Sequence, residues 1–171
     1  MKQDGEVIAV GGRGKSVHVV ARSGLAPVCE PLYMEGRIWS LAFMPPGVMQ
    51  SLGLLSSSSP MSLAMAVGSG DYVATVVDME GYHPVLRVMR SRAVRCVAYH
   101  PALPYLALGD GGNSVSIIDL LGEELVTEVS LEARVNTLAF SPLGDFLVVG
   151  TDDCSFTMHE TQVRPAQEFV L

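Results

Sequence analysis

The sequence has little cysteine, little positive charge and no long apolar run. Among its 171 residues only Cys29, Cys96 and Cys154 are cysteines. An odd number of widely spaced cysteines predicts neither a disulfide framework nor a clustered zinc site. We therefore expect free, buried or half-buried thiols in a reducing compartment.

Positive charge is scarce, because 11 Lys and Arg residues stand against 18 Asp and Glu residues and give a net charge of −7. This balance argues against nucleic acid as the main partner. The N-terminus "MKQDGEVIAV" carries acids where a signal peptide needs a basic start, and no later apolar run approaches the roughly 18 residues of a membrane span. The sequence thus predicts an intracellular protein without membrane insertion, in the cytoplasm rather than the nucleus.

What the chain does contain is an internal repeat. Three stretches align, and each places an aromatic residue two positions before a proline: "RIWSLAFMPPG" from Arg37, "AVRCVAYHPAL" from Ala93 and "RVNTLAFSPLG" from Arg134. Each is followed by a second apolar stretch that ends in glycine, and "VIAVGGRGK" near the N-terminus supplies a fourth such stretch. The repeat therefore extends over nearly the whole chain.

The glycines that end these stretches set the period. Gly68, Gly109 and Gly150 are equally spaced, whereas the interval from Gly11 to Gly68 is longer by sixteen positions. The equal spacing defines a repeat of about 41 residues, a length typical of tandem repeat architectures. The excess is accounted for by residues 47–62, "GVMQSLGLLSSSSPMS". Removing this segment restores one register throughout, so we interpret it as an inserted loop.

Within each repeat the segments are predicted to be short strands, because β-branched and large apolar residues alternate. Polar turns such as "GSGD", "GDGGN" and "GTDDC" separate the second strand from the third. Hairpin turns favour residues that tolerate positive φ, so we expect the repeated glycines to reverse the chain there. In this register Lys15 is predicted to stand at a turn tip with Asp71, Asn113 and Asp153.

A four-stranded antiparallel unit of about 41 residues in tandem is typical of a β-propeller blade. "FSPLGD" at residues 140–145 resembles a motif of the WD-repeat family, and "YHPALP" and "FMPPG" are degenerate versions of it. An acid ends each third strand where the family has its Trp-Asp pair: Asp78, Asp119 and Glu160. No repeat has the family's Gly-His pair or that tryptophan, so the side-chain network they support is expected to be weaker here.

The resemblance implies an all-β fold, a single partial propeller over residues 1–171 with about three and three-quarter blades. The blades are predicted at residues 6–33 (without a first strand), 37–90 (with the inserted loop 47–62), 93–130 and 134–171. Propellers need at least four blades. A fragment of a longer propeller is favoured, while an unusual four-bladed closure and a ring completed by another chain or by self-association stay open.

The WD-repeat resemblance also implies a scaffold that binds a protein or peptide and has no chemistry of its own. In that family the loops that enter the first strand and the turns between the second and third strands share one face. That face would carry Arg37, Trp39, Arg92, Arg95, Arg134, Asn136, Asp71, Asn113 and Asp153. Trp39 is the best single candidate for partner binding, since tryptophan is enriched at hot spots; packing between blades is the alternative.

The inserted loop offers a second candidate region. Met49 and Leu52 precede four consecutive serines, Ser56 to Ser59, a combination that suits a docking segment open to phosphorylation. A flexible linker without a partner is the favoured interpretation.

Two residue groups raise the question of catalysis or metal binding. Asp152 and Asp153 beside Cys154, with His159 nearby, are interpreted as a structural turn, because strand alternation separates these side chains. The remaining histidines occur singly at unrelated repeat positions, and no Gly-x-Ser-x-Gly motif is present. We expect no metal site.

One stretch fits a loose Walker A pattern, which would make the chain a nucleotide-binding enzyme or regulator. This stretch is residues 9–16, "AVGGRGKS". A phosphate-binding loop leads into a helix whose N-terminal amides face the phosphates. Lys15 leads instead into "SVHVVARSG", an alternation typical of a strand and cut short by Gly24 and Pro27. We favour a hairpin here and expect neither enzymatic activity nor a cofactor.

Overall fold

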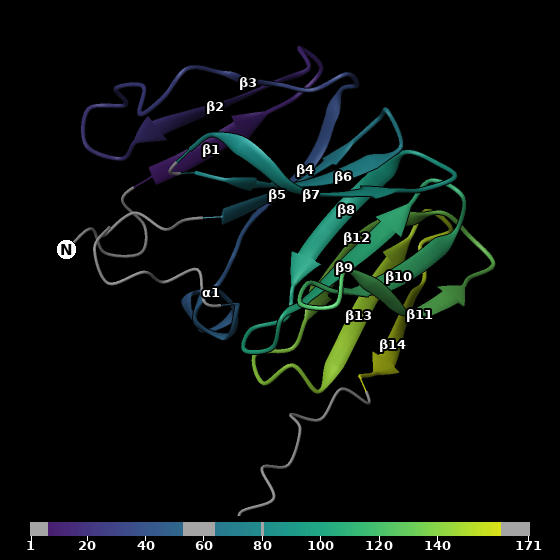
Figure 1. Cartoon of the computed structure of the whole chain (residues 1–171). Helices are drawn as coiled ribbons and strands as arrows, with labels where there is room; N and C mark the ends of the chain where they lie inside the picture. The colour runs from purple at the N-terminus through teal and green to yellow at the C-terminus, as the bar shows by residue number, and fades with distance from the viewer. Residues whose placement is uncertain (1–6, 53–63, 80, 162–171) are drawn as a thin grey trace, which may run out of the picture.

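The computed structural model describes residues 7–52, 64–79 and 81–161. These residues form four antiparallel sheets that follow one another in chain order (Figure 1). The all-β fold predicted from the repeat is confirmed, with sheets of three or four strands that match propeller blades. The fourth strand predicted for the last unit falls outside the described residues.

Each sheet is built from strands that are consecutive in the sequence. Sheet one contains β1 (Val7–Gly11), β2 (Ser16–Ala21) and β3 (Leu32–Tyr33). Sheet two contains β4 (Ile38–Phe43), β5 (Ala64–Ser69), β6 (Val73–Asp78) and β7 (His83–Met89). Sheet three contains β8 (Val94–Tyr99), β9 (Tyr105–Asp110), β10 (Ser114–Asp119) and β11 (Glu124–Ser130). Sheet four contains β12 (Val135–Phe140), β13 (Phe146–Thr151) and β14 (Phe156–Glu160).

The core lies between the sheets. Three clusters of buried apolar side chains fill the three boundaries, and each cluster draws on two consecutive sheets. At the boundary of sheets three and four, Val115 and Ile117 lie in one cluster with Leu147 and Val149. Among the first strands, β8 lies between β4 and β12 and contacts both. Each sheet is therefore stabilised mainly by its neighbours, as in other repeat proteins.

The repeated glycines serve this packing and not the turns, which corrects the sequence interpretation. Gly11, Gly68 and Gly109 lie within strands. A β-carbon on Gly109 would lie 2.5 Å from Cγ1 of Val135, at the start of the next sheet, and Gly11 and Gly68 meet Ile38 and Val94 in the same way. At these three positions a β-branched side chain of the following sheet occupies the space of a β-carbon. A β-carbon on Gly109 would also lie 2.5 Å from Sγ of Cys96, and one on Gly150 would meet Thr137 of its own sheet.

We expect Gly109→Ala to lower the free energy of unfolding by about 1–3 kcal/mol, because the added methyl group overpacks this boundary. Urea unfolding followed by circular dichroism measures the change. Gly111→Ala is the matched control, since a β-carbon there meets nothing closer than 3.6 Å. Equal stabilities of the two variants would contradict the packing role of Gly109.

The inserted segment does not start as a loop. Pro46–Ser51 forms helix α1, which lies below sheets one and two in Figure 1. Val48 and Met49 are buried in the cluster between sheets two and three, and Leu52 packs against it. Proline suits the first position of a helix, and the apolar residues that follow it fix the helix against the core. Met49 is therefore a core residue and not part of an exposed docking segment; Ser56 to Ser59 lie outside the described residues.

A buried histidine joins sheets three and four. His100 Nδ1 accepts hydrogen bonds from the backbone amides of Ala102 (3.1 Å) and Leu103 (2.9 Å). The ring packs edge-on against Phe140, at 5.2 Å between centroids, and hydrogen-bonds to the backbone of Gly144. Burial lowers the pKa of His100. The imidazole is thus held neutral as a structural group.

The three cysteines are free thiols. Cys96 is buried, and burial raises its pKa to about 12. Cys29 is half-buried, whereas Cys154 is exposed, which corrects the expectation that all three would be covered. Cys154 is exposed because it stands at the tip of a hairpin, after β13.

Candidate partner-binding face

In sheets two, three and four, the turn after the second strand lies beside the residue that precedes the first strand. The Gly70 amide donates to the Arg37 carbonyl (2.9 Å), and the Asp152 amide donates to the Arg134 carbonyl (3.0 Å). Gly111 bonds Ala93 in the same way, also at 2.9 Å. The two sets of predicted face residues therefore meet at one edge of each sheet, which we call the turn edge.

A β-bulge recurs at the start of β4, β8 and β12, the first strands of sheets two, three and four. The pairing register shifts between Ile38 and Ser40, and it shifts at the equivalent points of β8 and β12. The residues within these shifts are Trp39, Arg95 and Asn136. A bulge turns the side chain of the extra residue away from the regular pleat. Three of the predicted face residues thus share one backbone irregularity.

Trp39 lies between two guanidinium groups. The Cζ atoms of Arg37 and Arg95 lie 5.4 and 5.3 Å from the centroid of its ring. These distances are typical of cation–π contacts. Arg95 belongs to the next sheet, so the stack joins sheets two and three, while the Trp39 side chain stays 44 % exposed. The ring therefore both contacts the neighbouring sheet and presents an apolar surface to solvent.

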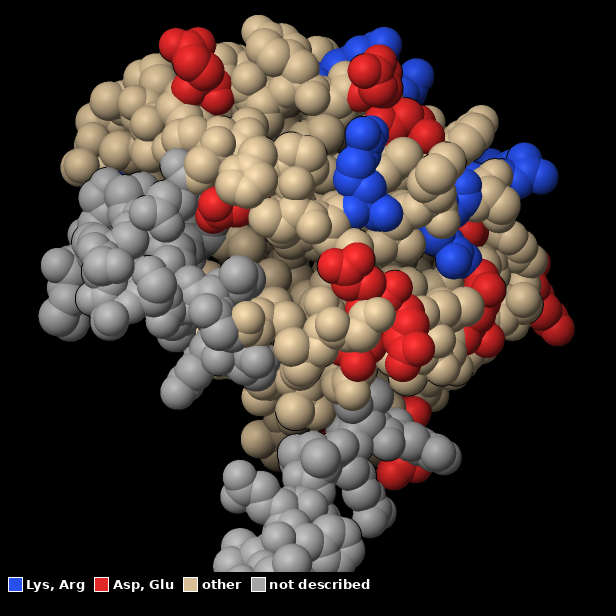
Figure 2. All heavy atoms as spheres, viewed as in Figure 1, with Lys and Arg blue, Asp and Glu red and all other residues tan. Residues whose placement is uncertain are grey.

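A shallow depression of about 670 Å³ lies at the turn edge between sheets three and four. Arg92 and Asn113 line it from sheet three, and Arg134 lines it from the other side. Glu132 and Asp152 add two carboxylates to the rim. Figure 2 shows Lys and Arg side chains gathered at the upper right of the molecule, next to several acidic side chains. The surface therefore carries mixed charge in a molecule that is acidic overall.

The polar turn residues stabilise the hairpins. Asp71 Oδ1 accepts from the Val73 amide (3.2 Å), and the Asn113 side chain donates to the Leu131 carbonyl (2.6 Å). Asp153 Oδ1 accepts from Thr151 and Ser155, and these hydrogen bonds lower the pKa of Asp153. Asp71, Asn113 and Asp153 thus have structural roles at the same edge.

The hairpin tips lie one residue from some predicted positions. Positive φ angles occur at Lys15 (61°), Tyr72 (71°), Asn113 (69°) and Cys154 (65°). Tyr72 and Cys154, not Asp71 and Asp153, are therefore equivalent to Lys15. These four positions follow one another at the same intervals as the four repeated glycines. The glycine spacing could therefore have identified the hairpin tips from the sequence. The polarity of the neighbouring aspartates favoured the wrong residues.

The two stretches that raised the question of nucleotide binding and of catalysis or metal binding have structural roles. The Walker A-like stretch is the hairpin of β1 and β2, and Lys15 leads into strand β2 and not into a helix. Asp153 accepts hydrogen bonds from its own turn. On β14, His159 Nε2 lies 2.9 Å from the Thr157 hydroxyl. Within residues 7–52, 64–79 and 81–161 no group of three or more His, Cys, Asp and Glu residues is placed to hold a metal ion.

Sequence reasoning missed one ionic cluster. Arg90, at the end of sheet two, forms an ion pair with Glu128 of sheet three and lies 3.9 Å from Asp110. The Ser114 hydroxyl donates to the same Glu128 carboxylate (2.5 Å), and these contacts lower the pKa of Glu128. Asp110 is only 2 % exposed, and its Oδ1 accepts from the Gly112 and Ser114 amides. The sequence signal for this cluster was Asp110, a charged residue at the end of the otherwise apolar strand β9.

Tandem antiparallel sheets, packed face to face and bearing their hairpin turns on one edge, define a β-propeller-type repeat protein. The family model described as "WD domain, G-beta repeat" matches residues 125–159, which include β12, β13 and most of β11 and β14. This match confirms the resemblance to the WD-repeat family, with one repeat detected by the family model. A comparison with curated protein sequences gave no significant match.

None of the helices in the described part of the chain is both long enough and apolar enough to span a membrane.

Proposed function

We propose that the chain is a protein-interaction scaffold that binds an acidic peptide segment at the turn edge and has no catalytic activity of its own. The observation that carries this proposal is the Trp39 ring, half-exposed between Arg37 and Arg95. The WD repeat at residues 125–159 supports an interaction role in general. Binding is proposed to take place inside the cell, in the cytoplasm.

The chemistry of the turn edge suits such a partner. Arginine binds carboxylates through two parallel hydrogen bonds, and tryptophan and arginine are the residue types most enriched at binding hot spots. Arg92 and Arg134 line the depression beside the stack and supply two more guanidinium groups. A peptide carboxylate can pair with these groups while an apolar side chain packs on Trp39.

Peptide selection tests the proposal. A displayed library of random linear peptides is panned on the full chain, and selected peptides are measured by fluorescence polarisation. We expect sequences enriched in Asp and Glu, and we expect Trp39→Ala or Arg95→Gln to weaken their binding at least tenfold. Leu121→Ala is the control, because Leu121 is 60 % exposed in the turn between β10 and β11, at the end of β10 opposite to the turn edge. Trp39→Phe distinguishes loss of the ring from loss of folding.

Two results would contradict the proposal. The first is a set of selected peptides without acidic residues, bound equally well by the Trp39→Ala and Leu121→Ala variants. The second is a clear rise in the melting temperature of the chain with Mg-ATP or Mg-GTP, which would favour the nucleotide-binding alternative.

A further inference from the structure

Each sheet boundary inside the chain is built from the same two surfaces. One sheet contributes side chains at fixed positions of its second and third strands, such as Ala107, Val115 and Ile117 of sheet three. The next sheet contributes side chains such as Leu147 and Val149. At the preceding boundary the repeat places the equivalent residues Ala66, Ala74 and Val76 opposite Leu106 and Leu108.

Sheet four presents the first of these surfaces to solvent. Val148, Phe156 and Met158 occupy the positions of Ala107, Val115 and Ile117, one repeat later in the sequence. Phe156 is 75 % exposed and Met158 is 61 % exposed, whereas their counterparts in sheet three are buried. We call Val148, Phe156 and Met158 the open face of sheet four.

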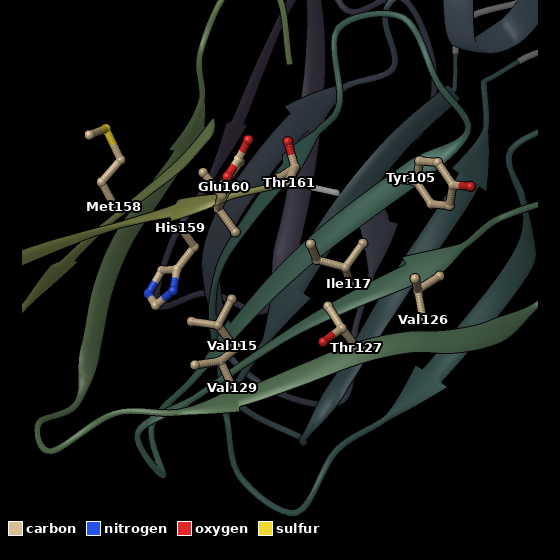
Figure 3. A pocket seen from close by; sticks show the side chains of 11 residues that line it. Tyr105, Val115, Ile117, Val126, Thr127, Val129, Met158, His159, Glu160 and Thr161 are labelled. Carbon is tan, nitrogen blue, oxygen red and sulfur yellow. The ribbon is translucent and has the colours of Figure 1, made fainter. Parts of the chain in front are cut away.

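The pleat of β14 places these side chains away from sheet three. Figure 3 shows His159 pointing toward Val115 and Val129, while Met158 points to the other side of the strand. Val148 pairs with Met158, and Gly150 pairs with Phe156. Residues directly opposite each other in a sheet share a face, so the apolar side chains form one continuous surface.

Sheet one presents the second surface at the other end of the array. Ile8 and Val10 occupy the repeat positions that Met65 and Val67 occupy in sheet two and that Leu147 and Val149 occupy in sheet four. Val10 is 55 % exposed and Ile8 is 41 % exposed, although all four counterparts are buried. We call Ile8 and Val10 the open face of sheet one.

We infer that the open face of sheet four binds the open face of sheet one of a second copy of this chain, in a head-to-tail arrangement. The two faces have the surface types that pack together three times within one chain, and each is apolar. Exposed contiguous apolar patches on a soluble chain mark interaction sites. This inference is independent of the proposed peptide site, which lies on the turn edge.

The match between the two open faces favours a second copy as the occupant, because each copy carries both surface types. A head-to-tail contact closes into a ring when the rotation between copies allows it. The described residues form four sheets, so two copies of them supply eight, and propellers contain four to eight blades. A pair of chains that uses both contacts at once buries all four open faces.

Sedimentation equilibrium of the full chain at concentrations of about 1 to 100 µM tests this inference. We expect a species of twice the 18.2 kDa chain mass. Phe156→Asp and Val10→Asp should each weaken self-association at least tenfold. An equimolar mixture of these two variants should associate again through its one intact contact, because each variant keeps the face that the other has lost.

The mixture separates a head-to-tail contact from a symmetrical one. Leu143→Asp is the matched control, because Leu143 is 80 % exposed in the turn before β13, away from both open faces, and it should leave self-association unchanged. Circular dichroism checks that each variant is folded; Phe156→Gln and Val10→Gln replace any variant that is not. A monomeric wild-type chain at every concentration, self-association of the Val10→Asp variant as strong as that of the wild type, or a mixture that associates no better than either variant alone would each overturn the inference.

Discussion

Gly144→Ala is expected to lower the free energy of unfolding by about 2–5 kcal/mol. Gly144 has a φ angle of 84°, a conformation that costs an L-residue about 1–2 kcal/mol. A β-carbon there would also lie 2.1 Å from Nε2 of His100, and overpacking of this kind costs about 1–3 kcal/mol. His100 cannot move aside easily, because its Nδ1 is held by two backbone amides.

Gly24→Ala provides the control for Gly144→Ala. Gly24 has nearly the same φ angle, 80°, and a β-carbon there meets no atom within 4 Å. Chemical denaturation of both variants therefore separates the backbone cost from the contact with His100. If the two variants lose equal stability, the contact between sheets three and four at His100 contributes nothing measurable.

Arg90→Met is expected to cost about 3 kcal/mol of stability, because removing one partner of a buried ion pair leaves the other charge uncompensated. The Arg90 guanidinium lies 3.9 Å from the buried Asp110 carboxylate and pairs with Glu128. Urea unfolding of the variant measures the loss. Arg87→Met should change stability by less than about 0.5 kcal/mol, since Arg87 is exposed on β7, the strand that precedes Arg90.

The double variant Arg90→Met with Asp110→Asn identifies the cause. Asparagine keeps the oxygen that accepts from the Gly112 and Ser114 amides but removes the negative charge. We expect the double variant to recover part of the lost stability. A double variant that is less stable than Arg90→Met by the full cost of Asp110→Asn alone would rule out charge compensation.

The period of the glycines predicted the strands, because the alternation of apolar residues and their regular repetition are properties of the sequence itself. The role of these glycines was predicted wrongly. The reason is physical: Gly109 is small because Val135, which belongs to the next sheet, lies against it. The distance between neighbouring sheets depends on how all the sheets pack together. The residues around Gly109 in the sequence therefore do not predict its contact with Val135.

The turn edge was predictable in outline, and its details were not. Residue polarity suggested Asp71 and Asp153 as hairpin tips, but the positive φ angles fall at Tyr72 and Cys154. The backbone path between paired strands decides which residue takes this conformation, even against that residue's own preference. The bulge at Trp39 likewise depends on how β4 pairs with β5.

Helix α1 affects how the array holds together when it begins to come apart. Val48 and Met49 of α1 add to the cluster between sheets two and three, whereas the described residues of the other two clusters belong to strands and loops. In a linear array the free energy of opening is the sum of sheet stabilities and nearest-neighbour terms. In a single chain whose end sheets are uncovered, we therefore expect order to be lost from both ends inward and the boundary between sheets two and three, which α1 covers, to open last.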